Sequence, residues 1–139
     1  MKSDRDLPAR KEHEMQFYKC LKCGNFVVFL TPKTACTPRC CGEEMAEVKP
    51  NTQDAALEKH VPAVTVEGNK VSVQVGSVAH PMLPEHYIQF VILETNKGFQ
   101  KKDIAPGEEP KAEFLLSDGE KPVAVYEYCN LHGLWSYTI

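Results

Sequence analysis

Apolar and polar residues alternate with a period of two over much of the second half of the chain. Apolar residues stand at alternate positions in three segments: Val71, Val73 and Val75; Ile88, Phe90 and Ile92; and Val123 and Val125. Each set is expected to share one face of a strand. Turn-forming residues separate the segments, at Gly68-Asn69, Asn96-Lys97-Gly98, Pro106-Gly107 and Asp118-Gly119. Short strands at this spacing predict an all-β antiparallel sandwich over residues 50–139.

The first part of the chain has a different pattern. Residues 1–14 are polar and aperiodic, and they predict a loose N-terminal extension. Residues 15–49 contain one short apolar strand (26–30) and too few large apolar side chains for a core, so a metal or a cross-link is expected to hold this domain together. Residues 50–52 connect it to the sandwich, and Asn51 or Thr52 is expected to cap a short helical turn over 54–58.

Composition excludes several classes of protein. The 139 residues are 42% hydrophobic and 25% charged, which is typical of a folded domain and not of a disordered chain. The net charge of -3 argues against a nucleic-acid partner, and residues 51–139 carry the acidic excess. Since the chain has neither an apolar run of membrane-spanning length nor a signal peptide, we expect no membrane partner and a cytoplasmic location.

The cysteines are concentrated near the N-terminus. Five of the six lie between Cys20 and Cys41, and their spacing predicts a tetrahedral four-thiolate metal site. The spacing leaves two ligand sets open: Cys20, Cys23, Cys36 and Cys40, or Cys20, Cys23, Cys40 and Cys41. Geometry favours the first set, because adjacent thiolates bind one ion at a strained angle. A zinc clip without electron chemistry is an equally good interpretation of the spacing.

A second candidate site combines histidines with the remaining cysteine. Four of the five histidines follow residue 50 (His60, His80, His86 and His132), and Cys129 stands three residues before the last of them. Four imidazoles and one thiolate exceed the four ligands of a structural zinc, which predicts a redox metal with an open position. The alternative is two unrelated groups of core histidines, which does not explain their concentration beside Pro and Gly.

Several segments resemble signature segments of the desulfoferrodoxin family of two-iron superoxide reductases. They are Glu58-Lys59-His60-Val61-Pro62, Gly76-Ser77-Val78-Ala79-His80-Pro81-Met82, His86-Tyr87-Ile88 and Tyr128-Cys129-Asn130-Leu131-His132-Gly133-Leu134-Trp135. Near the N-terminus, Tyr18-Lys19-Cys20 through Asn25 and Cys40-Cys41-Gly42-Glu43 resemble the desulforedoxin-like domain of the same family. The resemblance implies a small desulforedoxin-like domain followed by an immunoglobulin-like antiparallel β-sandwich.

The resemblance also implies two irons per chain. One iron is expected to be bound by His60, His80, His86 and His132, with Cys129 as the axial thiolate. The other is expected to be bound by Cys20, Cys23, Cys40 and Cys41, which is the set that geometry alone does not favour. Cys36 is then an extra thiol, either inert, a competing ligand or a site of oxidation. His13 has no counterpart in the family segments.

The activity implied is the one-electron reduction of superoxide to hydrogen peroxide, without dismutation. Lys59 is expected to attract the anion, and Glu58 to occupy the open position of the oxidised site. Without the resemblance, a solvated Glu58–Lys59 ion pair would be the better interpretation. The four-cysteine iron is expected to act as an electron relay or a structural clip. A rubredoxin-like electron donor and a homodimer are the expected partners.

Three rival interpretations follow from the same residues. An electron-transfer protein would have two closed metal centres, and a zinc-stapled binding module would contain no iron. A superoxide dismutase would also need the oxidised metal to accept an electron from superoxide, which a thiolate ligand opposes.

Overall fold

The computed structural model describes residues 15–52, 60–76 and 80–139. The chain divides into two compact units, Met1–Glu47 and Val48–Ile139. The finer domain limits expected from the sequence, 15–49 and 50–139, stay a prediction. The expected helical turn over 54–58 lies outside the described residues.

The N-terminal unit is built from very short strands. They are β1 (Phe17–Lys19), β2 (Phe26–Val28), β3 (Arg39–Cys40), β4 (Glu43–Glu44) and β5 (Ala46–Val48). Strands β2, β1 and β5 form one sheet in that order, and β3 pairs with β4 in a second. Among the described residues of this unit, Tyr18, Cys20 and Met45 form one apolar cluster, with three half-buried residues against it, and Met15 and Phe17 are also buried. So few buried apolar side chains agree with the expectation of too few large apolar residues for a core.

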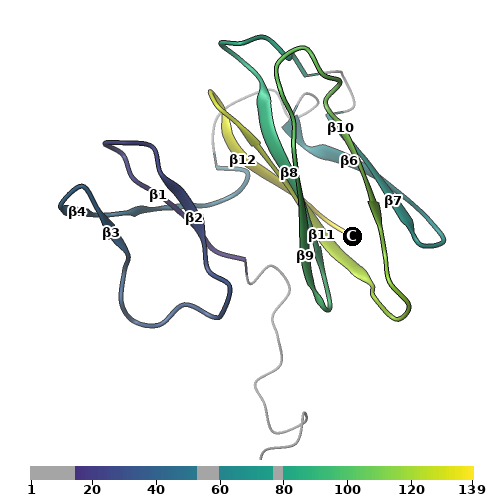
Figure 1. Cartoon of the computed structure of the whole chain (residues 1–139), viewed down its shortest axis with the longest axis horizontal. Coiled ribbons are helices and arrows are strands. Elements are labelled where there is room, and N and C mark those ends of the chain that lie inside the picture. The colour runs from purple at the N-terminus through teal and green to yellow at the C-terminus, as the bar shows by residue number, and fades with distance from the viewer. Residues whose placement is uncertain (1–14, 53–59, 77–79) are drawn as a thin grey trace, which may run out of the picture. The chain divides into compact units, whose positions relative to one another are not determined.

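The second unit is an antiparallel sandwich of two sheets (Figure 1). One sheet has the order β10-β7-β6 and the other the order β12-β11-β8-β9. The strands are β6 (Pro62–Glu67), β7 (Lys70–Val75), β8 (Ile88–Thr95), β9 (Gly98–Asp103), β10 (Lys111–Leu115), β11 (Pro122–Cys129) and β12 (Gly133–Thr138). The all-β prediction is confirmed, and the four predicted turns fall between strands.

The sandwich core joins the inward faces of both sheets. Val71, Val73 and Val75 are at most 2% exposed, as their alternation predicts. They belong to one buried cluster with Leu93 and Val125 of the opposite sheet. In the part of the chain that is described, no helix is long and apolar enough to span a membrane.

One predicted strand face is wrong. Ile88 belongs to the core cluster, but the next members from β8 are Val91 and Leu93, not Phe90 and Ile92. The pairing of β8 with β11 shifts register at this point, since Tyr128 opposes Phe90 while Cys129 opposes Ile88. Such an irregularity inserts an extra residue and reverses the faces beyond it. Because residues 90–93 are all apolar, the sequence does not show which of them face the core.

Candidate metal centres

The four predicted histidines and Cys129 come together at one end of the sandwich unit. Their ligand atoms all lie within 4.8 Å of one another. His60 stands just before β6, and His80 and His86 lie in the connection from β7 to β8. Cys129 ends β11 and pairs with Gly133 across a tight turn that carries His132. Segments far apart in the sequence therefore converge because the strands that they flank are packed together.

The four imidazole rings form a closed square. Successive ring centroids are separated by 4.7 Å from His60 to His80, 4.7 Å from His80 to His86, 4.9 Å from His86 to His132 and 4.7 Å from His132 to His60. Each ring is nearly perpendicular to its neighbours, with interplanar angles of 79–84°. This arrangement directs one edge of every ring toward a common centre.

The nitrogen spacing fits a metal ion at that centre. His60 Nε2 lies 2.9 Å from His132 Nδ1 and 3.2 Å from His80 Nε2. Four nitrogens in a square, each about 2.1 Å from an ion, would have neighbours about 3.0 Å apart. The Cys129 sulfur adds a fifth donor. Five donors exceed the tetrahedral set of a structural zinc, and imidazole with thiolate suits iron.

Hydrogen bonds and burial prepare these donors for binding. His80 Nδ1 lies 2.7 Å from the Pro81 carbonyl, so it carries the proton and leaves Nε2 free to bind a metal. Burial lowers the pKa of His80 to about 4, which keeps this imidazole neutral near pH 7. Burial raises the pKa of the Cys129 thiol, while the backbone N–H of His132, 3.4 Å from the sulfur, stabilises the thiolate.

Two residues beside the site were not singled out from the sequence. The Trp135 ring lies 5.1 Å from the His60 ring, and its Nε1 donates to the His132 carbonyl at 3.0 Å. Glu127, two residues before Cys129, is fully buried, and its carboxylate oxygens have no hydrogen-bond partner among the described residues. Burial raises the pKa of Glu127 well above its ordinary value. An acidic residue within an apolar strand was the available signal for Glu127.

A second donor cluster lies in the N-terminal unit. The sulfurs of Cys20, Cys23, Cys40 and Cys41 lie within 4.8 Å of one another. The sulfur of Cys40 is 3.6 Å from that of Cys23 and 3.9 Å from that of Cys41. A tetrahedral ion with metal–sulfur distances of about 2.3 Å separates its sulfurs by about 3.8 Å, so the cluster fits such an ion.

The structure brings together the adjacent pair Cys40 and Cys41 and leaves Cys36 outside the cluster, exposed to solvent. The backbone explains how adjacent sulfurs converge. Cys41 has φ of 53° and Gly42 has φ of 77°, both in the left-handed region. This turn reverses the chain between β3 and β4 and brings the two adjacent sulfurs together, and the left-handed backbone at Cys41 carries the strain.

The thiols of this cluster differ in acidity. The backbone N–H of Cys23 donates to the Cys20 sulfur at 3.4 Å and lowers the pKa of Cys20 to about 6. Hydrogen bonds with the Cys23 and Cys20 sulfurs raise the pKa of Cys41 to about 12. The Cys20 thiolate therefore forms readily, whereas ionising Cys41 as well requires a cation among the sulfurs.

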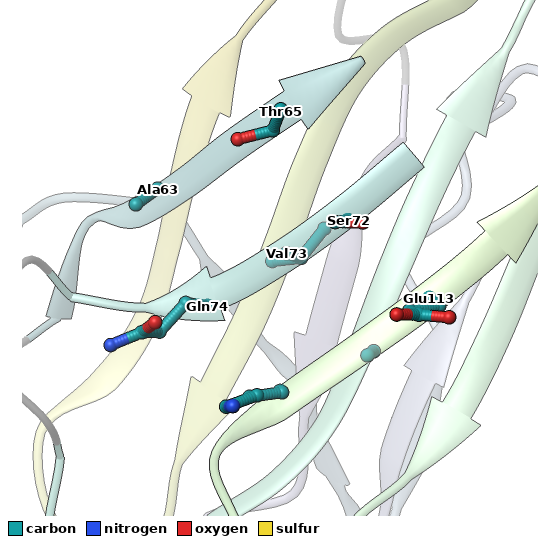
Figure 2. A pocket seen from close by; sticks show the side chains of 8 residues that line it. Ala63, Thr65, Ser72, Val73, Gln74 and Glu113 are labelled. Atoms are coloured by element: carbon teal, nitrogen blue, oxygen red, sulfur yellow. The ribbon is translucent and has the colours of Figure 1, made fainter. Parts of the chain in front are cut away.

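A pocket on the sandwich shares no lining residue with either donor cluster. Figure 2 shows its lining side chains on β6, β7 and β10, among them Ala63, Ser72 and Glu113. These three alternate with the core residues and so face outward. The lining contains no histidine or cysteine, and its charged groups, Lys111 and Glu113, are exposed. The lining of this pocket therefore gives no indication of a further metal site.

Glu58 and Lys59 lie outside the described residues, so their predicted roles stay proposals.

Comparisons with known proteins identify the family of the chain. The desulfoferrodoxin family model matches residues 52–138. A desulfoferrodoxin homolog of Archaeoglobus fulgidus is 45% identical over 87% of this chain and 94% of its own length. The crystal structure of the superoxide reductase from Treponema pallidum is 41% identical, covers 91% of this chain and 100% of that chain, and has a TM-score of 0.78.

A shorter relative matches only part of the chain. The one-iron superoxide reductase from Giardia intestinalis is 38% identical, with a TM-score of 0.52. The match covers 59% of this chain and 97% of the Giardia chain. Because the family model covers most of the chain and the Archaeoglobus relative is 45% identical over 87% of it, the chain belongs to the desulfoferrodoxin family.

Proposed function

We propose that the protein is a superoxide reductase, which reduces superoxide by one electron to hydrogen peroxide without dismutation. The main observation behind this proposal is the square of four imidazoles with the Cys129 sulfur as fifth donor. Iron held there supplies the electron, and two protons complete the hydrogen peroxide. The family membership and the superoxide reductases among the related structures support this assignment.

The donors divide into a buried and an accessible part. His60, His80 and Cys129 are at most 3% exposed, whereas His86 and His132 are partly exposed. The buried donors hold the ion and keep the thiolate away from water. The partly exposed histidines leave a path for a small anion and for protons from solvent, which the reaction consumes.

The test measures how much peroxide forms for each superoxide consumed. The iron-loaded, reduced chain is expected to yield one peroxide per superoxide, with no dioxygen released. A dismutase would give one peroxide for two superoxides, together with dioxygen. A protein that holds only zinc, or that leaves superoxide unconsumed, would contradict the proposal and favour the binding module or the closed electron-transfer protein.

Lys59 is proposed to attract superoxide by local charge, because the acidic excess of residues 51–139 opposes an anion. Lys59→Ala is expected to lower the second-order rate with superoxide by about tenfold and to flatten its dependence on salt. Pulse radiolysis at several ionic strengths measures both effects. Lys111→Ala removes an exposed lysine that pairs with Glu109 on the outer face, and it serves as the matched control. An unchanged rate in the Lys59 variant would remove Lys59 from the mechanism.

Glu58 is proposed to bind the oxidised site once the electron has left it. Glu58→Ala is expected to keep the reaction with superoxide fast, since the carboxylate does not act on the reduced site. The visible spectrum of the oxidised variant should differ from that of the wild type, because a ligand has been lost. Identical oxidised spectra would exclude this role.

The remaining assignments concern the context of the reaction. We propose a rubredoxin-like protein as the electron donor, since each turnover consumes one electron, and donor-dependent reduction of the iron tests this. A homodimer is proposed from the resemblance, and sedimentation velocity measures it. A cytoplasmic location is supported by the six free cysteines, which suit a reducing compartment. Cell fractionation tests it.

A further inference from the structure

Among the described residues, three asparagines make the same set of hydrogen bonds. Each donates its backbone N–H to a carbonyl of a neighbouring segment, accepts a backbone N–H through Oδ1 and donates from Nδ2 to a second carbonyl. Asn51 bonds in this way to Leu134 and Ser136 of β12. Asn96 bonds in this way to Gly119 and Lys121. The side-chain amide thus extends backbone pairing where no strand continues.

Asn130 makes this set of bonds inside the metal site. Its backbone N–H donates to the Tyr87 carbonyl at 3.2 Å. Its Oδ1 accepts the Tyr87 N–H at 2.9 Å, and its Nδ2 donates to the Glu85 carbonyl at 3.1 Å. Glu85 and Tyr87 are the residues on either side of His86. The three bonds therefore hold the backbone of His86 from both sides.

We call these three hydrogen bonds of Asn130 to Glu85 and Tyr87 the clamp. Asn130 itself lies in the loop that carries two more donors. Asn130 directly follows Cys129 and precedes His132 by two residues. In the same loop the His132 N–H donates to the Cys129 sulfur at 3.4 Å, and Trp135 holds the His132 carbonyl. Any displacement of Asn130 would move the Cys129 sulfur relative to His86. Three of the five donors are thus joined through this one side chain.

We propose that Asn130 is a positioning residue that fixes His86 relative to Cys129 and His132. The inference rests on the proposed function, because it concerns the same metal site. Asn130 does not bind the ion itself; it determines the geometry that the ligands offer. Outer partners of metal ligands commonly change metal affinity by about 10- to 100-fold when they are removed.

The chemistry of asparagine explains why close substitutes should fail. Aspartate at this position would still accept the Tyr87 N–H. It would however place an oxygen against the Glu85 carbonyl oxygen, where Nδ2 now donates at 3.1 Å. Alanine would lose both side-chain bonds. Asn130→Asp therefore keeps one of the two side-chain bonds and replaces the other with a repulsion, whereas Asn130→Ala keeps neither bond.

The test compares Asn130→Ala and Asn130→Asp with Asn96→Ala in the full, iron-loaded chain. Asn96→Ala is a matched control, because it removes the same side-chain bonds from the same fold at a turn without metal donors. Three quantities are measured: loss of iron to a chelator, the sulfur-to-iron absorption band of the oxidised protein, and its midpoint potential. Thermal unfolding reports general destabilisation.

Asn130→Ala is expected to lose iron about 10- to 100-fold more readily than the wild type and to shift the absorption band. Asn130→Asp should also lose iron more readily and shift the band, because it replaces the bond to the Glu85 carbonyl with a repulsion between oxygens. Asn96→Ala should lower the unfolding temperature but leave the iron retention, band and potential unchanged. If Asn130→Ala does not fold, Asn130→Asp decides by the same measurements.

Iron retention, band and potential equal to the wild type in the folded Asn130 variants would overturn the proposal. Equal changes in Asn96→Ala would also overturn it, because they would show a general loss of stability. A wild-type chain that binds iron but makes no peroxide from superoxide would contradict the proposed function instead. Iron retention by the variants would still test the clamp in that case.

Discussion

Cys129→Ser is expected to cause the largest loss of activity of any single substitution in the chain. The Cys129 sulfur is fully buried beside the ring of imidazoles and is the only sulfur among those five donors. A serine hydroxyl stays protonated near neutral pH and donates far less electron density to iron than a thiolate does. The rate with superoxide should therefore fall by at least about 100-fold, or about 2.7 kcal/mol of activation free energy.

Two spectroscopic results should accompany this loss. The absorption band from sulfur to iron at this site should disappear, and the midpoint potential should rise, because an anionic ligand no longer stabilises the oxidised metal. Cys36→Ser is the matched control, since Cys36 is an exposed thiol outside both donor clusters. Cys36→Ser should leave rate, band and potential unchanged. A Cys129 variant with the wild-type band would exclude this sulfur as a ligand.

Loss of the metal from the N-terminal cluster is expected to unfold that unit alone. Its buried apolar residues, among those described, are Met15, Phe17, Tyr18, Cys20 and Met45, and its strands are two or three residues long. A structural metal in so small a unit contributes on the order of 10 kcal/mol, more than so few apolar residues can replace. Cys23→Ser should therefore collapse the dispersed amide NMR signals of residues 15–47.

The same variant separates the two roles of the N-terminal iron. Signals of the sandwich and the absorption of its imidazole site should stay as in the wild type, because the chain divides into two compact units. If the N-terminal iron relays electrons, a donor protein should reduce the second iron more slowly in Cys23→Ser. If it is a clip, that reduction should be unchanged. Dispersed signals for residues 15–47 in the metal-free variant would contradict the expected dependence on metal.

The alternation of apolar and polar residues predicted the buried face correctly where the strands are regular. Val71, Val73 and Val75 enter the core as predicted, because side chains of a regular strand point to alternate faces. The prediction failed at Phe90 and Ile92, where the register between β8 and β11 shifts. A shift of one residue depends on the partner strand, so no pattern within β8 could reveal it.

For the candidate metal sites too, the sequence predicted some features, and others depended on the tertiary structure. Residue types and spacing were enough to single out the histidines and cysteines, because metal ligands belong to few residue types. Spacing could not choose between Cys36 and Cys41, since the choice depends on the left-handed turn at Cys41 and Gly42. The resemblance to a known family implied the pair that the structure brings together.

The sequence by itself determined the all-β class, the turns, and two groups of donors of the right chemistry for two metal ions. These properties depend on residue type and on neighbours along the chain. Only the tertiary structure decided that four imidazoles form a square, and that Asn130 joins the loops of Cys129 and His86. Tyr87 and Asn130 are 43 positions apart. Contacts over such a separation arise only when the strands pack, because the packing sets which loops become neighbours.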